Sequence, residues 1–176
     1  MPAIPWRMQL GFVAAFYAAV LGLATTLVVE RYLQYGRHPE YATASSGMYA
    51  GGDLMLEIFI AGALLVPTIV LVLVIAKSEA AFTIYSKILL AFSLSAPLAF
   101  GLLSIPAMSS GPGLLGFVCL YRLEASPFTL AAAGFSRGAA RFQTPKRLTL
   151  FALQAEGLTL VAVVSGFAFS VLGHHR

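Results

Sequence analysis

Residues 54–76 read LMLEIFIAGALLVPTIVLVLVIA, an apolar run in which Glu57 is the one ionisable side chain. About 20 consecutive apolar residues suffice for a helix to cross the hydrocarbon core of a bilayer. Pro67 lies inside the run, and a membrane helix tolerates an internal proline better than a soluble helix does. The run therefore predicts a kinked transmembrane helix.

Three other stretches, residues 8–29, 88–108 and 148–172, are equally apolar and contain at most one charged residue each. Hydrophobic residues make up 59% of the 176 residues and charged residues 10%. So few charges cannot supply the polar shell of a soluble globule of this length. We predict an all-α, polytopic integral membrane protein of a bacterial-type inner or plasma membrane, with one domain built around a bundle of four transmembrane helices.

Residues 114–135 are also apolar, but Arg122, Glu124 and Pro127 interrupt them. Such an interrupted run predicts an additional interfacial or re-entrant helical segment rather than a fifth span. The residues between the spans are polar or rich in turn formers, which predicts a surface connection over residues 30–52 and a short link over residues 77–86.

The positions of Lys and Arg predict the orientation, because these residues are enriched in cytoplasmic loops. With four spans, the connections after the first and third spans carry Arg31, Arg37, Arg122, Arg137, Arg141, Lys146 and Arg147. The opposite side carries Arg7, Lys77, Lys87 and Arg176. Both chain ends are then predicted to lie outside the cytoplasm. If residues 114–135 cross instead, the amino terminus is cytoplasmic and the carboxyl terminus lies outside.

Two carboxylates within the predicted spans suggest a polar site, because a charge at the middle of a membrane helix costs at least about 2.5 kcal/mol. Glu57 lies about 6 Å and Glu156, with Gln154 close by in sequence, about 12 Å from the start of the predicted span. Asp53 precedes Glu57 by one helical turn, and two like charges at this spacing require a counter-ion. Arg31 and Arg122 are the candidates for it.

These polar residues have a functional and a structural interpretation. In the functional one, Glu57 and Glu156 exchange a proton or a cation near one membrane face. In the structural one, Asp53 caps a helix start, Glu57 pairs with an arginine, and Glu156 makes an interhelical hydrogen bond. The structural interpretation is favoured, because both glutamates are predicted to lie nearer the interface than the midplane.

Basic and small residues indicate what the chain contacts. Arg137, Arg141, Lys146 and Arg147 precede the last span and form a topogenic segment that is also a candidate contact for anionic lipid. The net charge of +4 thus favours a lipid partner over nucleic acid. The first span contains closely spaced small residues, which we expect to pack against other helices of the same chain. They are Ala15, Ala18, Ala19 and Gly22.

The sequence assigns no catalytic, cofactor-binding or metal-binding residue. Cys119 is the one cysteine, and His38, His174 and His175 lie outside the predicted spans, so no haem ligand is predicted within the membrane. The leading hypothesis is a non-catalytic accessory or scaffold subunit that packs against other membrane subunits or copies of itself. The second is a small oligomeric transporter or ion-coupled carrier that uses Glu57 and Glu156. The third is an interfacial lipid-modifying enzyme that uses Glu30, Arg31, Asp53 and residues 122–124.

Overall fold

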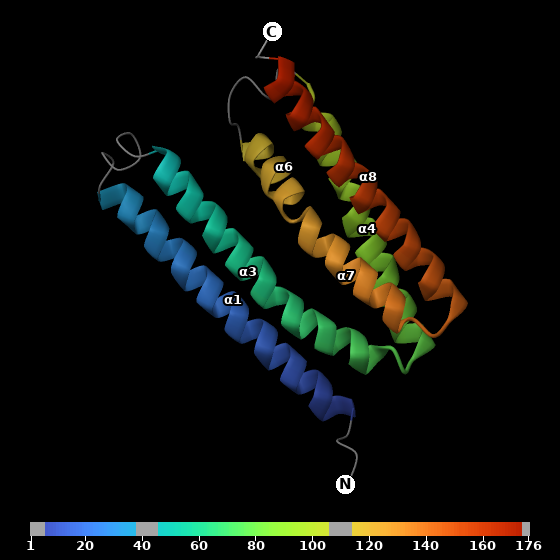
Figure 1. Ribbon diagram of the computed structural model, residues 1–176. Coiled ribbons are helices and arrows are strands. Elements are labelled where there is room, and N and C mark those ends of the chain that lie inside the picture. Colours follow the sequence, from blue (N-terminus) through green and yellow to red (C-terminus); the bar gives the residue numbers. More distant parts are fainter. Residues whose placement is uncertain (1–5, 38–45, 106–113, 174–176) are drawn as a thin grey trace. The chain divides into compact units, whose positions relative to one another are not determined.

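The computed structural model describes residues 6–37, 46–105 and 114–173. These residues form six α-helices and no strand (Figure 1). Four stretches in them are long and apolar enough to cross a membrane, namely Trp6–Leu27, Leu54–Ile75, Glu79–Leu103 and Gln143–Gly166. The predicted all-α fold with four helices of spanning length is thus confirmed. The chain divides into two compact units, Met1–Val74 and Ile75–Arg176, which are taken here in turn.

The first unit consists of α1 (Trp6–Arg37) and α3 (Ser46–Ile75), which lie side by side (Figure 1). Tyr17 of α1 and Thr68 of α3 form a hydrogen bond, with 2.7 Å between the hydroxyl oxygens. Val13, on the same side of α1 as Tyr17, is buried. Pro67 lies buried inside α3, as the sequence predicted.

Both helices of the first unit extend well into the predicted surface connection. Residues 30–37 continue α1 and residues 46–52 begin α3, so the predicted connection over residues 30–52 is wrong in extent. Residues 30–37 include Glu, Arg, Leu and Gln, which favour a helix even without apolar periodicity. Residues 38–45 lie outside the described part of the chain. Because α3 begins at Ser46, Asp53 does not cap a helix start, and that expectation is also wrong.

Small residues follow the side of α1 that points away from Val13 and Tyr17. Gly11, Ala15, Ala18 and Gly22 are spaced four, three and four residues apart, which places them on one helix face. All four are exposed, as is Ala19. A Cβ built at Gly11 or Gly22 would meet nothing within 4 Å in the described part of the chain. Within the first unit, Ala15 and Ala19 line a hollow with Pro67 and Val70 of α3, and the packing expected for the small residues stays a prediction.

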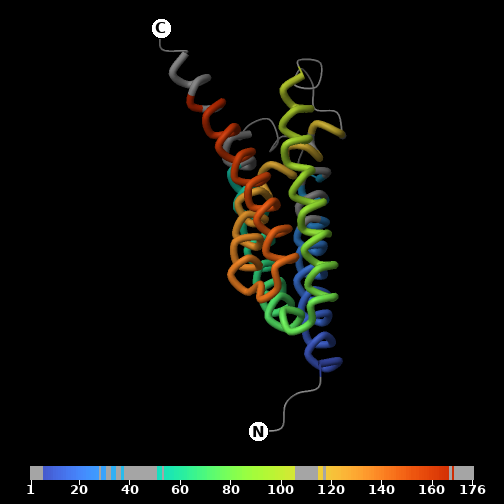
Figure 2. Tube along the Cα trace, turned by 90° about the vertical axis from the view of Figure 1, so that its right-hand side faces the viewer, coloured from blue at the N-terminus to red at the C-terminus, as the bar shows by residue number. Residues whose placement is uncertain are grey.

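The second unit contains the other four helices. They are α4 (Glu79–Leu103), α6 (Leu114–Glu124), α7 (Ser126–Ala139) and α8 (Gln143–Gly173). The most extensive contact is between α4 and α8, and α7 packs against α8 while α6 packs against α4. Figure 2 shows α8 and α4 from a second side. Leu89 of α4, Ala133 of α7 and Ala152 of α8 form a buried cluster at the centre of these contacts.

The third long helix begins earlier than its apolar run suggested. We predicted a span over residues 88–108 after a link over residues 77–86, but α4 begins at Glu79 and the link comprises residues 76–78. The Ser78 side chain accepts a hydrogen bond from the backbone N–H of Ala81, and Glu79 lies in the first turn, where the helix dipole favours a negative charge. The helix ends at Leu103, and the predicted end at Met108 lies outside the described residues.

The segment over residues 114–135 is helical and additional to the four long helices, as predicted. It consists of α6 and α7, separated at Ala125. Pro127 explains the break, because proline has no N–H to donate to the carbonyl four residues earlier and its ring clashes with that carbonyl. The backbone nevertheless keeps the helical direction through the break, since the Ala125 N–H donates to the Tyr121 carbonyl and the Thr129 N–H donates to the Ala125 carbonyl.

The helices of the second unit run in two directions. Arg122 of α6 contacts Ser95 of α4, whereas Ser136 of α7, later in the chain, contacts Tyr85, earlier in α4. From the end of α6 through α7, the chain therefore runs antiparallel to α4. The last helix, α8, runs parallel to α4 (Figure 1), so that the chain passes along the unit once up, once down and once up again.

Small and hydroxyl-bearing residues form the facing sides of α4 and α8. The buried residues of α4 recur at intervals of three and four, and are Phe82, Ser86, Leu89, Ser93, Ala96 and Ala99. The buried residues of α8 have the same spacing and are Pro145, Thr149, Ala152, Glu156 and Thr159. Short side chains allow two helix backbones to approach closely, which is a common way for helices to associate in lipid.

Candidate functional site

An ion pair between Arg122 of α6 and Glu156 of α8 lies inside the second unit. Arg122 Nη2 donates to Glu156 Oε1. The Glu156 side chain is fully buried, and the Arg122 side chain is 9% exposed. The pair thus joins the broken α6–α7 segment to the last helix, and it confirms the expectation of an interhelical hydrogen bond at Glu156.

Arg122 also binds α4 and α7. Its Nε donates to Ser95 Oγ at 2.7 Å, its Nη2 to the Phe92 carbonyl at 2.9 Å, and its Nη1 to Ser126 Oγ at 3.3 Å. The guanidinium Cζ lies 4.3 Å from the centroid of the Phe92 ring, a favourable cation–π distance. With Glu156, four of the five N–H groups of the guanidinium have acceptors. Arg122 therefore ties four helices together.

Two buried oxygens near this ion pair have no hydrogen-bond partner among the described residues. They are Glu156 Oε2 and Ser93 Oγ. Ser93 follows Leu89 by four residues on α4, and Glu156 follows Ala152 by four residues on α8. Because Leu89 and Ala152 belong to one buried cluster and the two helices are parallel, Ser93 and Glu156 lie at the same level. A hydroxyl donor and a carboxylate acceptor are thus available to a small polar guest at the α4–α8 interface.

Glu156 lies near the middle of the spanning stretch of α8, whereas Arg122 lies near the end of α6. Glu156 comes 13 residues after Gln143, about 20 Å along a span of 24 residues that is about 36 Å long. The predicted depth of about 12 Å was too small, because α8 begins at Gln143 rather than at residue 148. Counted along α8, Glu156 lies farther from the helix start than predicted, and its pairing with Arg122 supports the structural interpretation.

The remaining residues of the predicted polar site belong to α8 and to the first unit. Gln154 is exposed, since residues two apart point about 200° from each other on a helix. Glu57 is partly buried in α3 of the first unit, to which Arg31 and Asp53 also belong. The side chains of Arg31 and Asp53 lie outside the described part of the structure. Arg122 was considered as a counter-ion for Asp53 and Glu57, and the structure pairs it with Glu156 instead.

The sequence did not identify Phe92, Ser93, Ser95 or Ser126 as part of the site. The sequence contained a pattern that could have predicted Ser93 as part of the site. Ser86 and Ser93 are seven residues apart in one apolar helix, and Thr149 and Glu156 are seven residues apart in another. Two turns of a helix return to the same face, so polar residues recurring at this interval in two apolar helices indicate facing stripes. Phe92 and Ser95 carry no such signal.

The residues proposed for a lipid-modifying reaction belong to two units, with Glu30, Arg31 and Asp53 in the first and residues 122–124 in the second. Arg122 is buried and is not available to a reaction at the membrane surface, whereas Glu30 is exposed on α1. His38, His174 and His175 lie outside the described residues, and Cys119 is buried. Among the described residues, no three His, Cys, Asp or Glu side chains are grouped as metal ligands.

The basic residues that precede α8 gather at one end of the second unit. Arg137, Arg141, Lys146 and Arg147 are all exposed. Arg137 Nη1 donates to the Lys146 carbonyl at 3.1 Å and thereby links the end of α7 to the start of α8. Their exposure is compatible with the predicted contact with anionic headgroups.

No family model, curated protein or solved structure matches this chain.

Proposed function

We propose that this chain is a non-catalytic accessory subunit or scaffold of a membrane protein complex in an inner or plasma membrane. The observation that carries the proposal is the outward face of α1, formed by Gly11, Ala15, Ala18 and Gly22, which is called here the small-residue face. It is exposed along about three turns of the helix, although short side chains are what helices use when they pack closely in lipid. Its proposed occupant is a transmembrane helix of another subunit or of a second copy.

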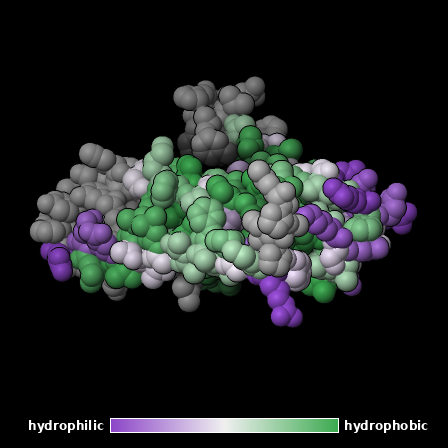
Figure 3. All heavy atoms as spheres, turned by 90° about the horizontal axis from the view of Figure 1, so that it is seen from below, coloured by the Kyte–Doolittle hydropathy of each residue, from purple (hydrophilic) through white to green (hydrophobic). Residues whose placement is uncertain are grey.

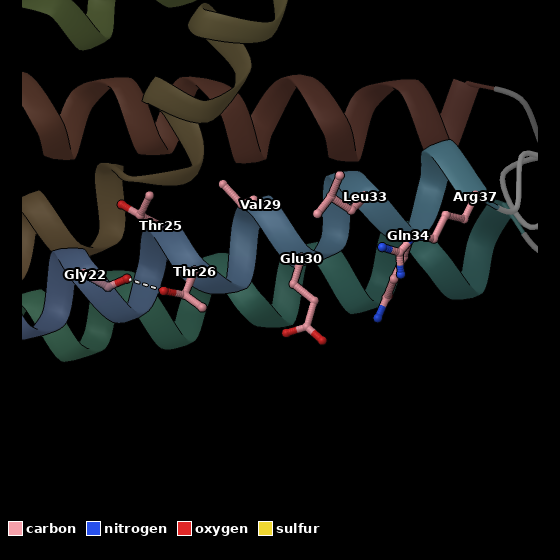
Figure 4. A pocket seen from close by; sticks show the side chains of 8 residues that line it. All are labelled: Gly22, Thr25, Thr26, Val29, Glu30, Leu33, Gln34 and Arg37. Carbon is pink, nitrogen blue, oxygen red and sulfur yellow. Dashed lines mark hydrogen bonds between the residues drawn. The ribbon is translucent and has the colours of Figure 1, made fainter.

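A shallow hollow on α1 continues the small-residue face toward the end of the helix. Gly22, Thr25, Thr26, Val29 and Leu33 are among the residues that line it. Figure 4 shows Gly22 and Thr26 at one end of the hollow, where the Thr26 hydroxyl donates to the Gly22 carbonyl of its own helix. The short side chains on this face from Gly11 to Thr26 leave room for a partner helix along about half of α1.

The surface of the chain also fits a subunit surrounded by lipid and other helices. Figure 3 shows a largely hydrophobic face, with hydrophilic atoms confined to separate clusters. Large apolar side chains are exposed on both units, including Phe59 of α3, Leu98 of α4 and Leu158 of α8. Such side chains require lipid or protein around them.

Substitutions in the small-residue face test the proposal. Ala18→Leu and Gly22→Leu are expected to abolish the assembly that wild-type chain forms in mild detergent, because each side chain would hold a partner helix away. Leu23→Phe is the matched control, since Leu23 is exposed on α1 but lies about 100° from Gly22. Native gel electrophoresis after cross-linking in the membrane provides the measurement. Copies with two different tags distinguish self-association from binding to another protein.

Wild-type chain that remains a monomer in the membrane would contradict the proposal, as would a Gly22→Leu variant that still assembles. Reduced assembly in Leu23→Phe to the same degree would show that bulk anywhere on α1 disturbs the fold. In that case the small-residue face would have no specific role.

We propose ion-coupled transport as the second candidate function, and the unpaired Glu156 Oε2 and Ser93 Oγ favour it. A carboxylate oxygen and a hydroxyl at the middle of two spans are groups that a proton or a small cation can occupy. Glu156→Gln and Glu57→Gln in reconstituted vesicles are expected to abolish ion flux if the chain is a carrier, with Gln154→Ala as the control. Undiminished flux in both variants would remove this candidate.

A further inference from the structure

We infer that α6 and α7 together cross the membrane, so that the chain crosses five times. The helices that precede and follow them, α4 and α8, run in the same direction. Both α4 and α8 contain a stretch of spanning length. They run parallel, because Leu89 and Ala152 share one cluster while Ser95 and Glu156, both later in their helices, bind the same arginine.

Two parallel spans require a return passage between them. If α4 and α8 both cross in the same direction, the chain leaves α4 on one side of the membrane and enters α8 from the other. The chain that connects them includes α6 and α7, which run back along α4 from the level of Ser95 to the level of Tyr85. A segment confined to one membrane surface cannot make this connection.

The combined segment is long enough to cross. Its two helices have 11 and 14 residues, which is about 37 Å of helix counted along the chain at 1.5 Å per residue, compared with about 30 Å for the hydrocarbon core. Its apparent obstacle is Arg122, whose charge is compensated by Glu156 and whose N–H groups are bound within the unit. Pro127 breaks the helix beside this arginine, and a break in a membrane helix is tolerated where neighbouring helices cover it.

The distribution of charge agrees with five crossings. Lys77 and Arg141 occupy the two short links at the end of the second unit where α4 and α8 begin, and Arg137, Lys146 and Arg147 adjoin the second link. The positive-inside rule places this end in the cytoplasm. Alternation along the chain then adds Arg7 to the cytoplasmic side and leaves Arg31, Arg37 and Arg176 on the other, with a cytoplasmic amino terminus and an external carboxyl terminus.

Cysteine labelling of the full-length chain in sealed cells tests this topology. In a Cys119→Ala background, which removes the one cysteine of the sequence, single cysteines replace Lys77, Ile105 or Arg141. All three positions are exposed and lie just outside helices. A membrane-impermeant maleimide is expected to label I105C in intact cells, because this position is external. It is expected to label K77C and R141C only in inverted membrane vesicles, in which the cytoplasmic face is exposed.

Labelling of I105C and R141C from the same side would overturn the inference, because the segment between them would then return to the side from which it came. A protease site inserted between residues 140 and 142, or directly after Ile105, provides a second reading in the full-length chain. Cleavage at the two sites from opposite sides supports the fifth crossing, and cleavage of both from one side overturns it. Neither outcome depends on the proposed partner of α1.

Discussion

In the first unit, α1 and α3 meet through Tyr17 and Thr68 and leave a face of small residues exposed, whereas the second unit encloses its polar residues between four helices. Buried residues make up 11% and 17% of the two spanning stretches in the first unit and 22% of each in the second. Small residues are present in both units. In the second they are covered by neighbouring helices of the same unit, whereas on α1 they are exposed within the first unit.

This difference separates two uses of the same side chains. Ala133 and Ala152 allow helices of one chain to approach, and the Arg122–Glu156 pair then fixes which helices meet and at what level. Gly11 and Gly22 would allow an equally close approach, and within the first unit nothing lies within 4 Å of a Cβ built at either position. The second unit is therefore expected to be the stable part of the chain, and the first unit the part whose packing is completed by another molecule.

The largest effect is expected from Arg122→Leu, which would abolish the feature that most distinguishes the second unit. The Glu156 carboxylate would remain buried without its counter-charge, and breaking a buried ion pair in this way costs about 3–5 kcal/mol. Thermal unfolding in detergent should show a large decrease in Tm. The double variant Arg122→Leu with Glu156→Leu should recover most of the loss, while Arg147→Leu, at an exposed site, should have little effect. A wild-type Tm for Arg122→Leu would remove the contrast between the units.

Ala152→Leu tests whether the second unit is as closely packed as its buried cluster indicates. Ala152 is fully buried between Leu89 and Ala133, and adding three carbons there should cost about 1–3 kcal/mol through overpacking. Ala131→Leu is the control, since Ala131 is exposed on α7. Equal unfolding temperatures for the two variants would mean that the interface has unfilled space.

The basic end of the second unit should bind anionic lipid more strongly than the first unit does. Removing a positive charge near an anionic headgroup weakens the interaction by about fivefold for each residue. Arg141→Gln combined with Arg147→Gln should therefore reduce the number of anionic lipids that the purified chain retains in native mass spectrometry. Arg37→Gln, on α1, should not. Unchanged retention in the double variant would assign these arginines a topogenic role alone.

The smallest effect is expected in the first unit from Tyr17→Phe. The variant loses the hydrogen bond to Thr68, and such interhelical bonds in membrane proteins contribute about 0.6 kcal/mol on average. Hydrogen exchange of the α1 amides should increase slightly. Thr26→Val is the control, because the Thr26 hydroxyl donates to the Gly22 carbonyl of its own helix. A loss as large as that for Arg122→Leu would show that the first unit is held as firmly as the second.

Apolar runs were sufficient to predict four long helices, because a helix that crosses a bilayer needs about 20 consecutive apolar residues and such a run can be recognised in the sequence. They misplaced the start of α4, since Ser78 and Glu79 form a helix start that lies outside the apolar run itself. Glu156 was identified from its isolation in an apolar span. Its depth and its partner were not, because Arg122 lies 34 residues earlier, in a segment whose charges and proline resemble a surface loop. A single sequence shows that a charged residue within an apolar span is energetically unfavourable. It does not show which distant side chain compensates that charge.

That separation of 34 residues has a consequence for how the protein is made. Arg122 leaves the ribosome before Glu156 has been synthesised, so α6 reaches the insertion machinery with an arginine that has no carboxylate to meet it. In the five-crossing topology inferred above, we therefore expect the burial of Arg122 to be completed only when α8 is inserted beside α6 and α7. A nascent chain arrested before Glu156 would keep its arginine segment in contact with water or with the translocon.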